Sequence, residues 1–235
     1  MSRVRSLLFG AWLYGCMLVL ALIFLPGFFG PRGWLMAGVR SWTRATVWGL
    51  RVFGGVRVEV RGAERRPAGP LLVAGKHQSM LDIFVPFLSL TDPALVLKRE
   101  LTRLPVFGPG VKKAGMIPVD REAHVAALKA MVADARARLA EGREVVIFPE
   151  GTRALPGSAP TYKPGVAALY RELDCACLPI ATNSGRHWSA KGLRLTPGVA
   201  VYEILEPIPA GLKRAEFMRT LQERIETATD ALLSA

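Results

Sequence analysis

Histidine and cysteine are scarce in this chain, with three residues of each among 235. The cysteines, Cys16, Cys175 and Cys177, show no zinc-ligand spacing, and their odd number argues against a framework of disulfide bonds. We expect them to be small buried side chains in a reducing compartment. The histidines form no HExxH pair, so no metal site is predicted. The absence of a G-x-S-x-G segment disfavours a serine hydrolase.

Acidic residues are few relative to basic ones, at 19 against 31, which gives a formal net charge of +12 at pH 7. Such an excess fits a partner that carries phosphates, which includes nucleic acid, an anionic bilayer and an acidic small molecule. No nucleic-acid-binding signature occurs, and we expect no nucleic-acid partner. The composition is 51% hydrophobic, somewhat apolar for a purely soluble enzyme.

Charge is absent altogether from residues 7–29. About 20 apolar residues suffice to span the hydrocarbon core of a bilayer, and a secretory signal would be shorter and would end in a small-residue cleavage site. We therefore expect a retained membrane anchor, with a core helix of a soluble protein as the alternative. Residues 34–53 combine tryptophans with arginines, which is typical of an amphipathic helix at the membrane interface.

Arginines flank the first apolar segment on both sides, so the positive-inside rule gives no clean single crossing. Two geometries stay open: the first helix spans the membrane, or the two helices form a hairpin that dips into one leaflet. Residues 1–53 are thus predicted to be a membrane-associated two-helix anchor, and residues 54–235 to be a separate α/β domain.

The rest of the chain alternates short apolar runs with longer helical patterns. This order predicts an α/β fold with a mixed, largely parallel sheet flanked by helices. Reactive groups in such sheets gather beyond the carboxyl ends of the strands. Strands are expected at residues 56–60, 71–75, 94–97, 116–119, 144–148, 176–181 and 199–205, and helices at 81–90, 124–141, 165–173 and 213–233.

A histidine and an aspartate, His77 and Asp82, follow the second of these strands. Five positions apart on one regular helix they would not share a face, but a turn followed by a helix start would bring them together. A carboxylate on one imidazole nitrogen leaves the other free to accept a proton, as in a general base. The alternative is a helix-capping aspartate beside an unrelated histidine.

The segment FPEGTR, residues 148–153, leaves the most apolar strand and turns at a proline and a glycine. The bend presents backbone N–H groups, the Thr152 hydroxyl and the Arg153 guanidinium to one point, as an anionic oxygen requires. Glu150 is expected to brace an arginine or to orient a hydroxyl. The alternative is a charged surface turn.

Further cations lie near strand ends, including Lys98 and, after the short strand at 116–119, Arg121. Taken alone, each of these cations is interpreted as a solvated surface side chain. Taken together they suggest a phosphate site, because guanidinium groups match phosphate oxygens.

Four segments occur in order: HX4D from His77 to Asp82, residues 115–121, FPEGTR at 148–153, and LPI at 178–180. This set resembles the glycerolipid acyltransferase family, in particular its bacterial lysophosphatidate acyltransferases. The resemblance covers about residues 70–185 and the apolar N-terminus. Lys76 and Pro118 depart from it, since many members have asparagine at the first position and an aromatic or aliphatic residue at the second.

The resemblance implies transfer of a fatty acyl group from a thioester of acyl carrier protein or coenzyme A to the sn-2 hydroxyl of lysophosphatidate. It makes His77 the general base and Asp82 its orienting partner, with no bound cofactor. The implied substrate-binding residues are Lys98, Gly115, Arg121, Glu150, Gly151, Thr152 and Arg153.

The implied partners are a membrane lipid substrate, an anionic bilayer surface and acyl carrier protein. The implied location is the cytoplasmic membrane, with the active site facing the cytoplasm. Two other functions stay open: acylation of a different lyso-lipid, and a non-catalytic module that binds anionic lipid.

Overall fold

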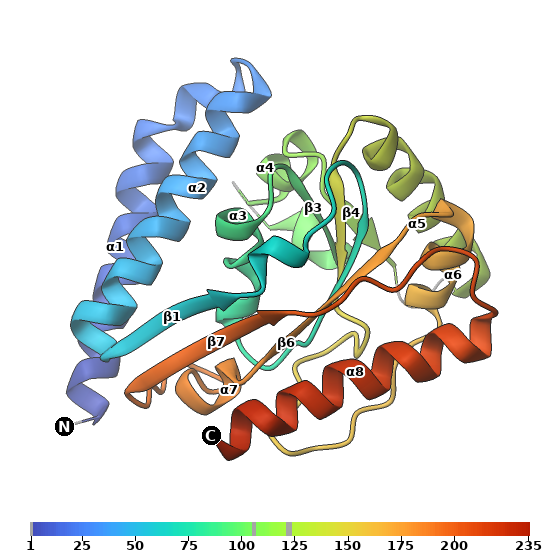
Figure 1. The fold of residues 1–235 in the computed structure, drawn as a ribbon. Coiled ribbons are helices and arrows are strands. Elements are labelled where there is room, and N and C mark those ends of the chain that lie inside the picture. Colours follow the sequence, from blue (N-terminus) through green and yellow to red (C-terminus); the bar gives the residue numbers. More distant parts are fainter. Residues whose placement is uncertain (1, 105–106, 121–123) are drawn as a thin grey trace.

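A single mixed sheet forms the centre of the molecule (Figure 1), for which the computed structural model describes residues 2–104, 107–120 and 124–235. Within these residues the sheet has seven strands in the order β1-β7-β6-β2-β5-β3-β4. Neighbouring strands pair in parallel, except that β6 and β7 are antiparallel. The predicted mixed, largely parallel sheet is confirmed. Its strands are β1 Val56–Arg61, β2 Leu72–Gly75, β3 Pro93–Lys98, β4 Ile117–Val119, β5 Glu144–Ile147, β6 Cys177–Thr182 and β7 Gly198–Ile204.

The two central strands, β2 and β5, are buried along their whole length. They read as continuous apolar runs because helices cover both faces of the sheet. Successive side chains on a strand point to opposite faces. Accordingly Val145 and Ile147 pack in one apolar core, and Val146 packs in the other.

Helices cover both faces of the sheet (Figure 1). Residues of α5, α6 and α8 fill the core on one face, and residues of α1 join the core on the other. The C-terminal helix, expected at 213–233, packs on the core through the buried side chains of Phe217, Leu221 and Ile225. The helices are α1 Ser2–Ile23, α2 Arg32–Gly49, α3 Pro86–Ser89, α4 Phe107–Lys113, α5 His124–Ala140, α6 Gly165–Leu173, α7 Ser184–His187 and α8 Arg214–Ser234.

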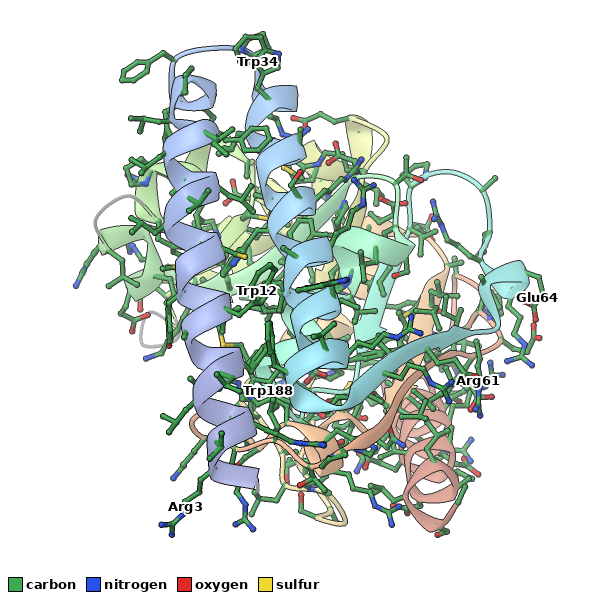
Figure 2. The ribbon with its side chains drawn as sticks, turned by 90° about the vertical axis from the view of Figure 1, so that its left-hand side faces the viewer. Arg3, Trp12, Trp34, Arg61, Glu64 and Trp188 are labelled. Carbon is green, nitrogen blue, oxygen red and sulfur yellow. The ribbon has the colours of Figure 1, made fainter. Side chains whose placement is uncertain are left out.

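The N-terminal segment forms a pair of helices, and Figure 2 shows α1 and α2 side by side with Trp12 between them. Trp12 Nε1 donates a hydrogen bond to the Ala45 carbonyl at 2.8 Å. By length and composition α1 is the one described helix that could cross a membrane. It ends at Ile23 rather than near residue 29, because a 3-10 turn with Pro26 follows. The division into an anchor at 1–53 and a domain at 54–235 stays a prediction.

The helix expected over residues 81–90 is confirmed as an apolar helical segment, Met80–Ser89, but not as one regular α-helix. The chain instead forms a 3-10 turn, Met80–Ile83, and the one-turn helix α3. Pro86 has no backbone N–H to donate to the preceding turn, so the regular hydrogen-bond ladder is interrupted there, although Phe84 and Val85 keep helical backbone angles. The short helices α4 and α7 were not predicted, since each is too short to show a helical period.

Candidate active site

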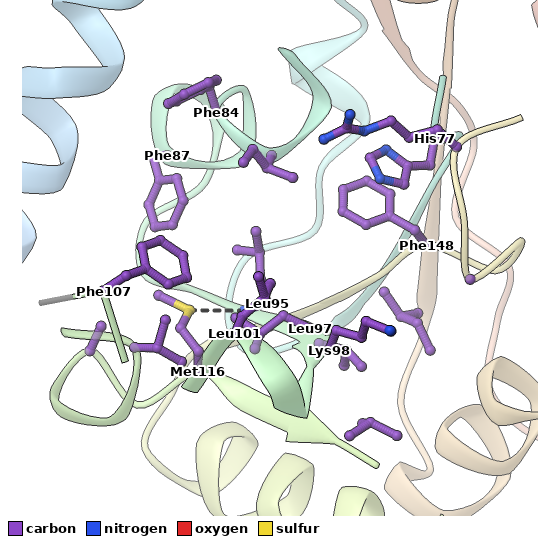
Figure 3. A pocket seen from close by; sticks show the side chains of 18 of the residues that line it. His77, Phe84, Phe87, Leu95, Leu97, Lys98, Leu101, Phe107, Met116 and Phe148 are labelled. Atoms are coloured by element: carbon purple, nitrogen blue, oxygen red, sulfur yellow. Dashed lines mark hydrogen bonds between the residues drawn. The ribbon is translucent and has the colours of Figure 1, made fainter. Parts of the chain in front are cut away.

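A cavity of about 1390 Å³ lies at the carboxyl edge of the sheet (Figure 3). His77 from the segment after β2, residues 151–153 after β5 and Lys98 at the end of β3 all line it. The rule that polar groups gather beyond parallel strands therefore holds here. Most of the wall is apolar and comes from α1, α2, α3, α4 and β3, with Phe84, Phe87, Leu95, Leu97, Phe107 and Met116 among the labelled residues.

The His77 ring is held on two sides. Its Nδ1 lies 3.0 Å from Asp82 Oδ2, and its plane stacks on Phe148 with ring centroids 4.3 Å apart. The side chain is 13% exposed and lies at the cavity wall (Figure 3). A carboxylate on Nδ1 favours the tautomer with its proton there. No described residue hydrogen-bonds Nε2, so this nitrogen can accept a proton from a molecule in the cavity.

Local backbone structure brings Asp82 to the ring. Ser79 is an extended N-cap residue whose hydroxyl accepts the Leu81 N–H, and Asp82 accepts the Ser79 N–H in return at 2.7 Å. The Gln78 N–H donates to the same Asp82 oxygen at 2.6 Å. This reciprocal capping pattern fixes the turn. Asp82 therefore caps the turn and also contacts the histidine, so the alternative of a capping aspartate beside an unrelated histidine is wrong.

Two hydroxyls from the other half of the chain hold the second oxygen of Asp82. Ser184 Oγ donates to Oδ1 at 2.5 Å, and Tyr202 OH donates to it at 2.7 Å. Burial alone would raise the pKa of Asp82, but His77, Ser184 and the Ser79 amide outweigh it and hold this pKa below its usual range. Sequence reasoning missed Ser184 and Tyr202, because no local signal links them to residue 82.

Glu150 does not line the cavity but supports the backbone of His77. Its side chain is buried, and Oε1 accepts the His77 backbone N–H at 3.1 Å. Burial raises the pKa of Glu150 to about 7, against the opposing effect of backbone hydrogen bonds and of Lys76. Arg153 of the same motif donates to the Ala190 carbonyl at 2.9 Å.

The FPEGTR turn places donors beside the base. Gly151 adopts a φ of +68°, a conformation that favours glycine, and its N–H closes the turn on the Phe148 carbonyl at 3.0 Å. The Ala154 N–H then donates to the His77 carbonyl at 2.7 Å, which joins the two motifs. Gly151, Thr152 and Arg153 line the same cavity as His77.

The remaining predicted residues fall into three cases. Lys98 lines the cavity and lies 3.3 Å from Glu100. Gly115 is a turn residue with a φ of +67°, where a Cβ atom would approach Arg143 Nη1 to 2.5 Å, and it shapes the approach to β4 from outside the cavity wall. Arg121 lies outside the described residues. Among the described residues, no group of three or more His, Cys, Asp or Glu side chains could hold a metal ion.

Comparison with known proteins identifies the family. A family model described as Acyltransferase matches residues 57–183, which contain His77, Asp82 and the FPEGTR turn. The chain belongs to the acyltransferase family. This family region covers β1 to β6 and so includes every strand whose carboxyl end borders the cavity.

Several curated proteins resemble this acyltransferase. A 1-acyl-sn-glycerol-3-phosphate acyltransferase from Pseudomonas aeruginosa is 39% identical over 162 residues, covering 68% of this chain and 62% of the relative. A human 1-acyl-sn-glycerol-3-phosphate acyltransferase alpha is 31% identical, covering 75% of this chain and 63% of the relative. The matched part thus spans somewhat less than two thirds of these relatives' length.

A solved structure shares the fold over the whole chain. It is described as the 1-acyl-sn-glycerophosphate (LPA) acyltransferase PlsC from Thermotoga maritima, with a TM-score of 0.81 and 21% sequence identity. The likeness covers 100% of this chain and 99% of that one, so the N-terminal helix pair is included.

Proposed function

We propose that this acyltransferase transfers a fatty acyl group from an acyl thioester to the sn-2 hydroxyl of lysophosphatidate, which gives phosphatidate. One observation carries the proposal: His77, paired with Asp82, lines a largely apolar cavity that Arg153 also lines. An apolar wall suits an acyl chain, and a cation near the base suits a phosphate. The names of the relatives agree with this substrate.

In the proposed reaction, His77 Nε2 takes the proton of the lysophosphatidate hydroxyl while the oxygen attacks the thioester carbonyl carbon. The C–O bond forms, and the carbonyl oxygen carries negative charge in the tetrahedral intermediate. Collapse of the intermediate breaks the C–S bond, and the imidazolium returns its proton to the leaving thiolate. General-base catalysis of this kind contributes about 10²–10⁴-fold.

Asp82 stabilises the imidazolium formed in the first step, and its lowered pKa keeps it ionised throughout. Because its Oδ1 is held by Ser184 and Tyr202, the carboxylate also fixes the ring orientation. We assign the acceptor phosphate to Thr152 and Arg153 together with Lys98 and Arg121. Holding the phosphate brings the hydroxyl to the base and removes ordering entropy from the chemical step.

The N-terminal helices are proposed to hold the enzyme at a membrane surface. Apolar side chains are exposed along α1, including Leu7, Leu8, Leu18, Val19, Leu22 and Ile23. Both ends of α1 contact the α/β body, because Ser6 Oγ accepts the Leu195 N–H and Lys113 donates to the Phe28 carbonyl in the turn after the helix. A helix tied to the body at both ends favours the hairpin in one leaflet over a crossing.

We place the enzyme at the cytoplasmic membrane with its cavity facing the cytoplasm. Lysophosphatidate then reaches the cavity from the bilayer, and the thioester arrives from the aqueous side. The net charge of +12 favours an anionic bilayer surface and an acidic carrier protein or coenzyme A.

A product assay tests the function. The full chain in phospholipid vesicles is incubated with labelled acyl thioesters of acyl carrier protein or coenzyme A, and with lysophosphatidate or lyso-lipids of other head groups. Phosphatidate as the main product supports the proposal, and the better thioester identifies the donor. Transfer to another lyso-lipid alone refutes the acceptor assignment. Lipid binding without transfer from either donor refutes the enzyme and favours a lipid-binding module.

A further inference from the structure

A buried lysine lies immediately before the proposed base. Lys76 follows β2, and only 1% of its side chain is exposed. A buried ammonium group is unfavourable unless it is paired. Its Nζ lies 2.7 Å from Oε1 and 2.5 Å from Oε2 of Glu226, and 3.7 Å from Oε1 of Glu150. Lys76 is therefore enclosed by two carboxyl groups.

Glu226 brings the C-terminal helix into this cluster. It lies on α8, 150 positions from Lys76, and its side chain is 20% exposed. The buried Tyr162 also donates its hydroxyl proton to Glu226 Oε1 at 2.7 Å. Glu226 thus joins α8 to the segment before α6 and to the residue next to the base.

Glu150 connects the cluster to His77. Its Oε1 faces Lys76 and also accepts the His77 backbone N–H at 3.1 Å. A continuous line of contacts therefore runs from Glu226 through Lys76 and Glu150 to the main chain of His77. Among the described residues Glu150 Oε2 has no hydrogen-bond partner, which leaves a place for a proton on that oxygen.

None of the four side chains in this cluster borders the described cavity. The lining includes His77 and residues 151–153, and it does not include Lys76, Glu150, Tyr162 or Glu226. The side chains of the cluster contact the base through the His77 backbone and do not line the cavity themselves, so its members are positioning residues.

We propose that Lys76, held in place by Glu226 of the C-terminal helix, fixes Glu150 against the backbone of His77 and so keeps the base in its working position. The proposal rests on the acyl transfer described above. It adds α8, outside the matched family region 57–183, to the elements that support the base.

The charges around Glu150 give the inference a pH signature. The groups that interact with it are Lys76, His77 and Tyr162, and Glu226 contacts both Lys76 and Tyr162. Burial raises its pKa to about 7, and the ammonium of Lys76 acts in the opposite direction. Without that ammonium the pKa of Glu150 would rise further, so an ionised Glu150 would require a higher pH. The acid limb of the pH profile of kcat should therefore move to higher pH.

The test uses the full chain in vesicles with lysophosphatidate, and measures kcat and KM across pH together with the thermal midpoint. Lys76→Met keeps the length of the side chain and removes its charge. We expect kcat to fall by about 10- to 100-fold, because a small displacement of the base is costly, while KM changes by less than about threefold. The acid limb of kcat should move to higher pH.

Two exposed positions supply matched controls. Lys129→Met on α5 and Glu223→Gln, three residues before Glu226 on the same helix, should leave kcat, KM and the acid limb unchanged. If Lys76→Met does not fold, the double variant Lys76→Met/Glu226→Gln removes both charges of the closest pair and should show the same kcat loss.

The outcomes separate this inference from the proposed function. The positioning role is overturned if the wild type is active and its folded Lys76 variants keep the wild-type kcat and the wild-type acid limb. A loss confined to KM would also overturn it, because the cluster would then act on binding. A lowered thermal midpoint with unchanged kcat would show a purely structural role. Wild type that transfers no acyl group would refute the proposed function, and the inference with it.

Discussion

The two sides of His77 are built differently. Asp82 holds the ring and Glu150 holds the main chain, and each is only 2% exposed. The pKa of Asp82 nevertheless lies below its usual range, whereas that of Glu150 is raised to about 7. Burial acts on both in the same direction, so the difference comes from their partners.

The number of hydrogen-bond donors explains the contrast. Asp82 accepts from two backbone amides, the His77 ring and the hydroxyls of Ser184 and Tyr202. Among described side chains Glu150 has one cation nearby, Lys76 at 3.7 Å. Donors favour the ionised form and burial disfavours it. Asp82, which holds the ring, therefore keeps a fixed negative charge, and Glu150, which holds the main chain, titrates near neutral pH.

Among substitutions of the groups that hold His77, removing the charge of Asp82 should lower kcat the most. Asp82→Asn keeps the size of the side chain but can favour the wrong tautomer of His77. We expect kcat to fall by about 10²–10⁴-fold, up to the loss expected for removal of the base itself. Steady-state turnover, with the thermal midpoint as a check on folding, measures this. A folded variant within tenfold of wild type would show that the ring needs no charged partner.

Removing one hydrogen-bond donor from Asp82 tests how much the contacts of its Oδ1 contribute to the site. Tyr202→Phe deletes a single hydroxyl, and we expect kcat to fall by about tenfold and the stability to drop by about 1–3 kcal/mol, since the lost bond is to a charged group. Unfolding curves and kcat measure the two effects. Tyr14→Phe, at an exposed tyrosine of α1, is the matched control and should change neither. Equal behaviour of the two variants would show that the Tyr202 hydroxyl supports neither Asp82 nor the fold.

The two carboxyl groups should also give opposite pH dependences of stability. The pKa of Asp82 is lowered on folding, so its contribution is present at neutral pH and is lost as the pH falls through the folded value. The pKa of Glu150 is raised, so its contribution is present at low pH and is lost as the pH rises from the ordinary carboxyl range to about 7.

Glu150→Gln should remove the second dependence, because glutamine does not titrate. We expect the thermal midpoint of wild type, relative to this variant, to fall by about 5 °C between pH 5 and pH 8. Scanning calorimetry at several pH values measures the difference. Parallel curves for wild type and variant would show that Glu150 does not change its protonation in this range. This is the smallest effect of the set.

Much of the fold was readable from the sequence because its signals are local. All seven predicted strands are present, since each is a short apolar or alternating run between turn residues. The helical segment expected at 81–90 is present, but it is divided into a 3-10 turn and one α-helical turn, because Pro86 supplies no backbone N–H to the hydrogen-bond ladder.

The candidate site likewise contains residues that short motifs reveal and residues that only the folded structure brings in. His77, Asp82 and the FPEGTR turn lie in short motifs, and their approach follows from the parallel order of β2 and β5. Ser184 and Tyr202 lie 102 and 120 positions from Asp82 and meet it only through the sheet order and α7. Glu226 reaches Lys76 across 150 positions. Contacts of this kind depend on the packed structure, and no spacing rule predicts them.

The most direct test of the account is the turnover of His77→Ala with lysophosphatidate and its preferred acyl thioester, measured in vesicles beside wild type. Because the base is removed while the apolar cavity and the cations remain, we expect kcat to fall by about 10²–10⁴-fold with little change in the thermal midpoint. A folded His77→Ala protein that forms phosphatidate at nearly the wild-type rate would contradict the assignment of His77 as the base.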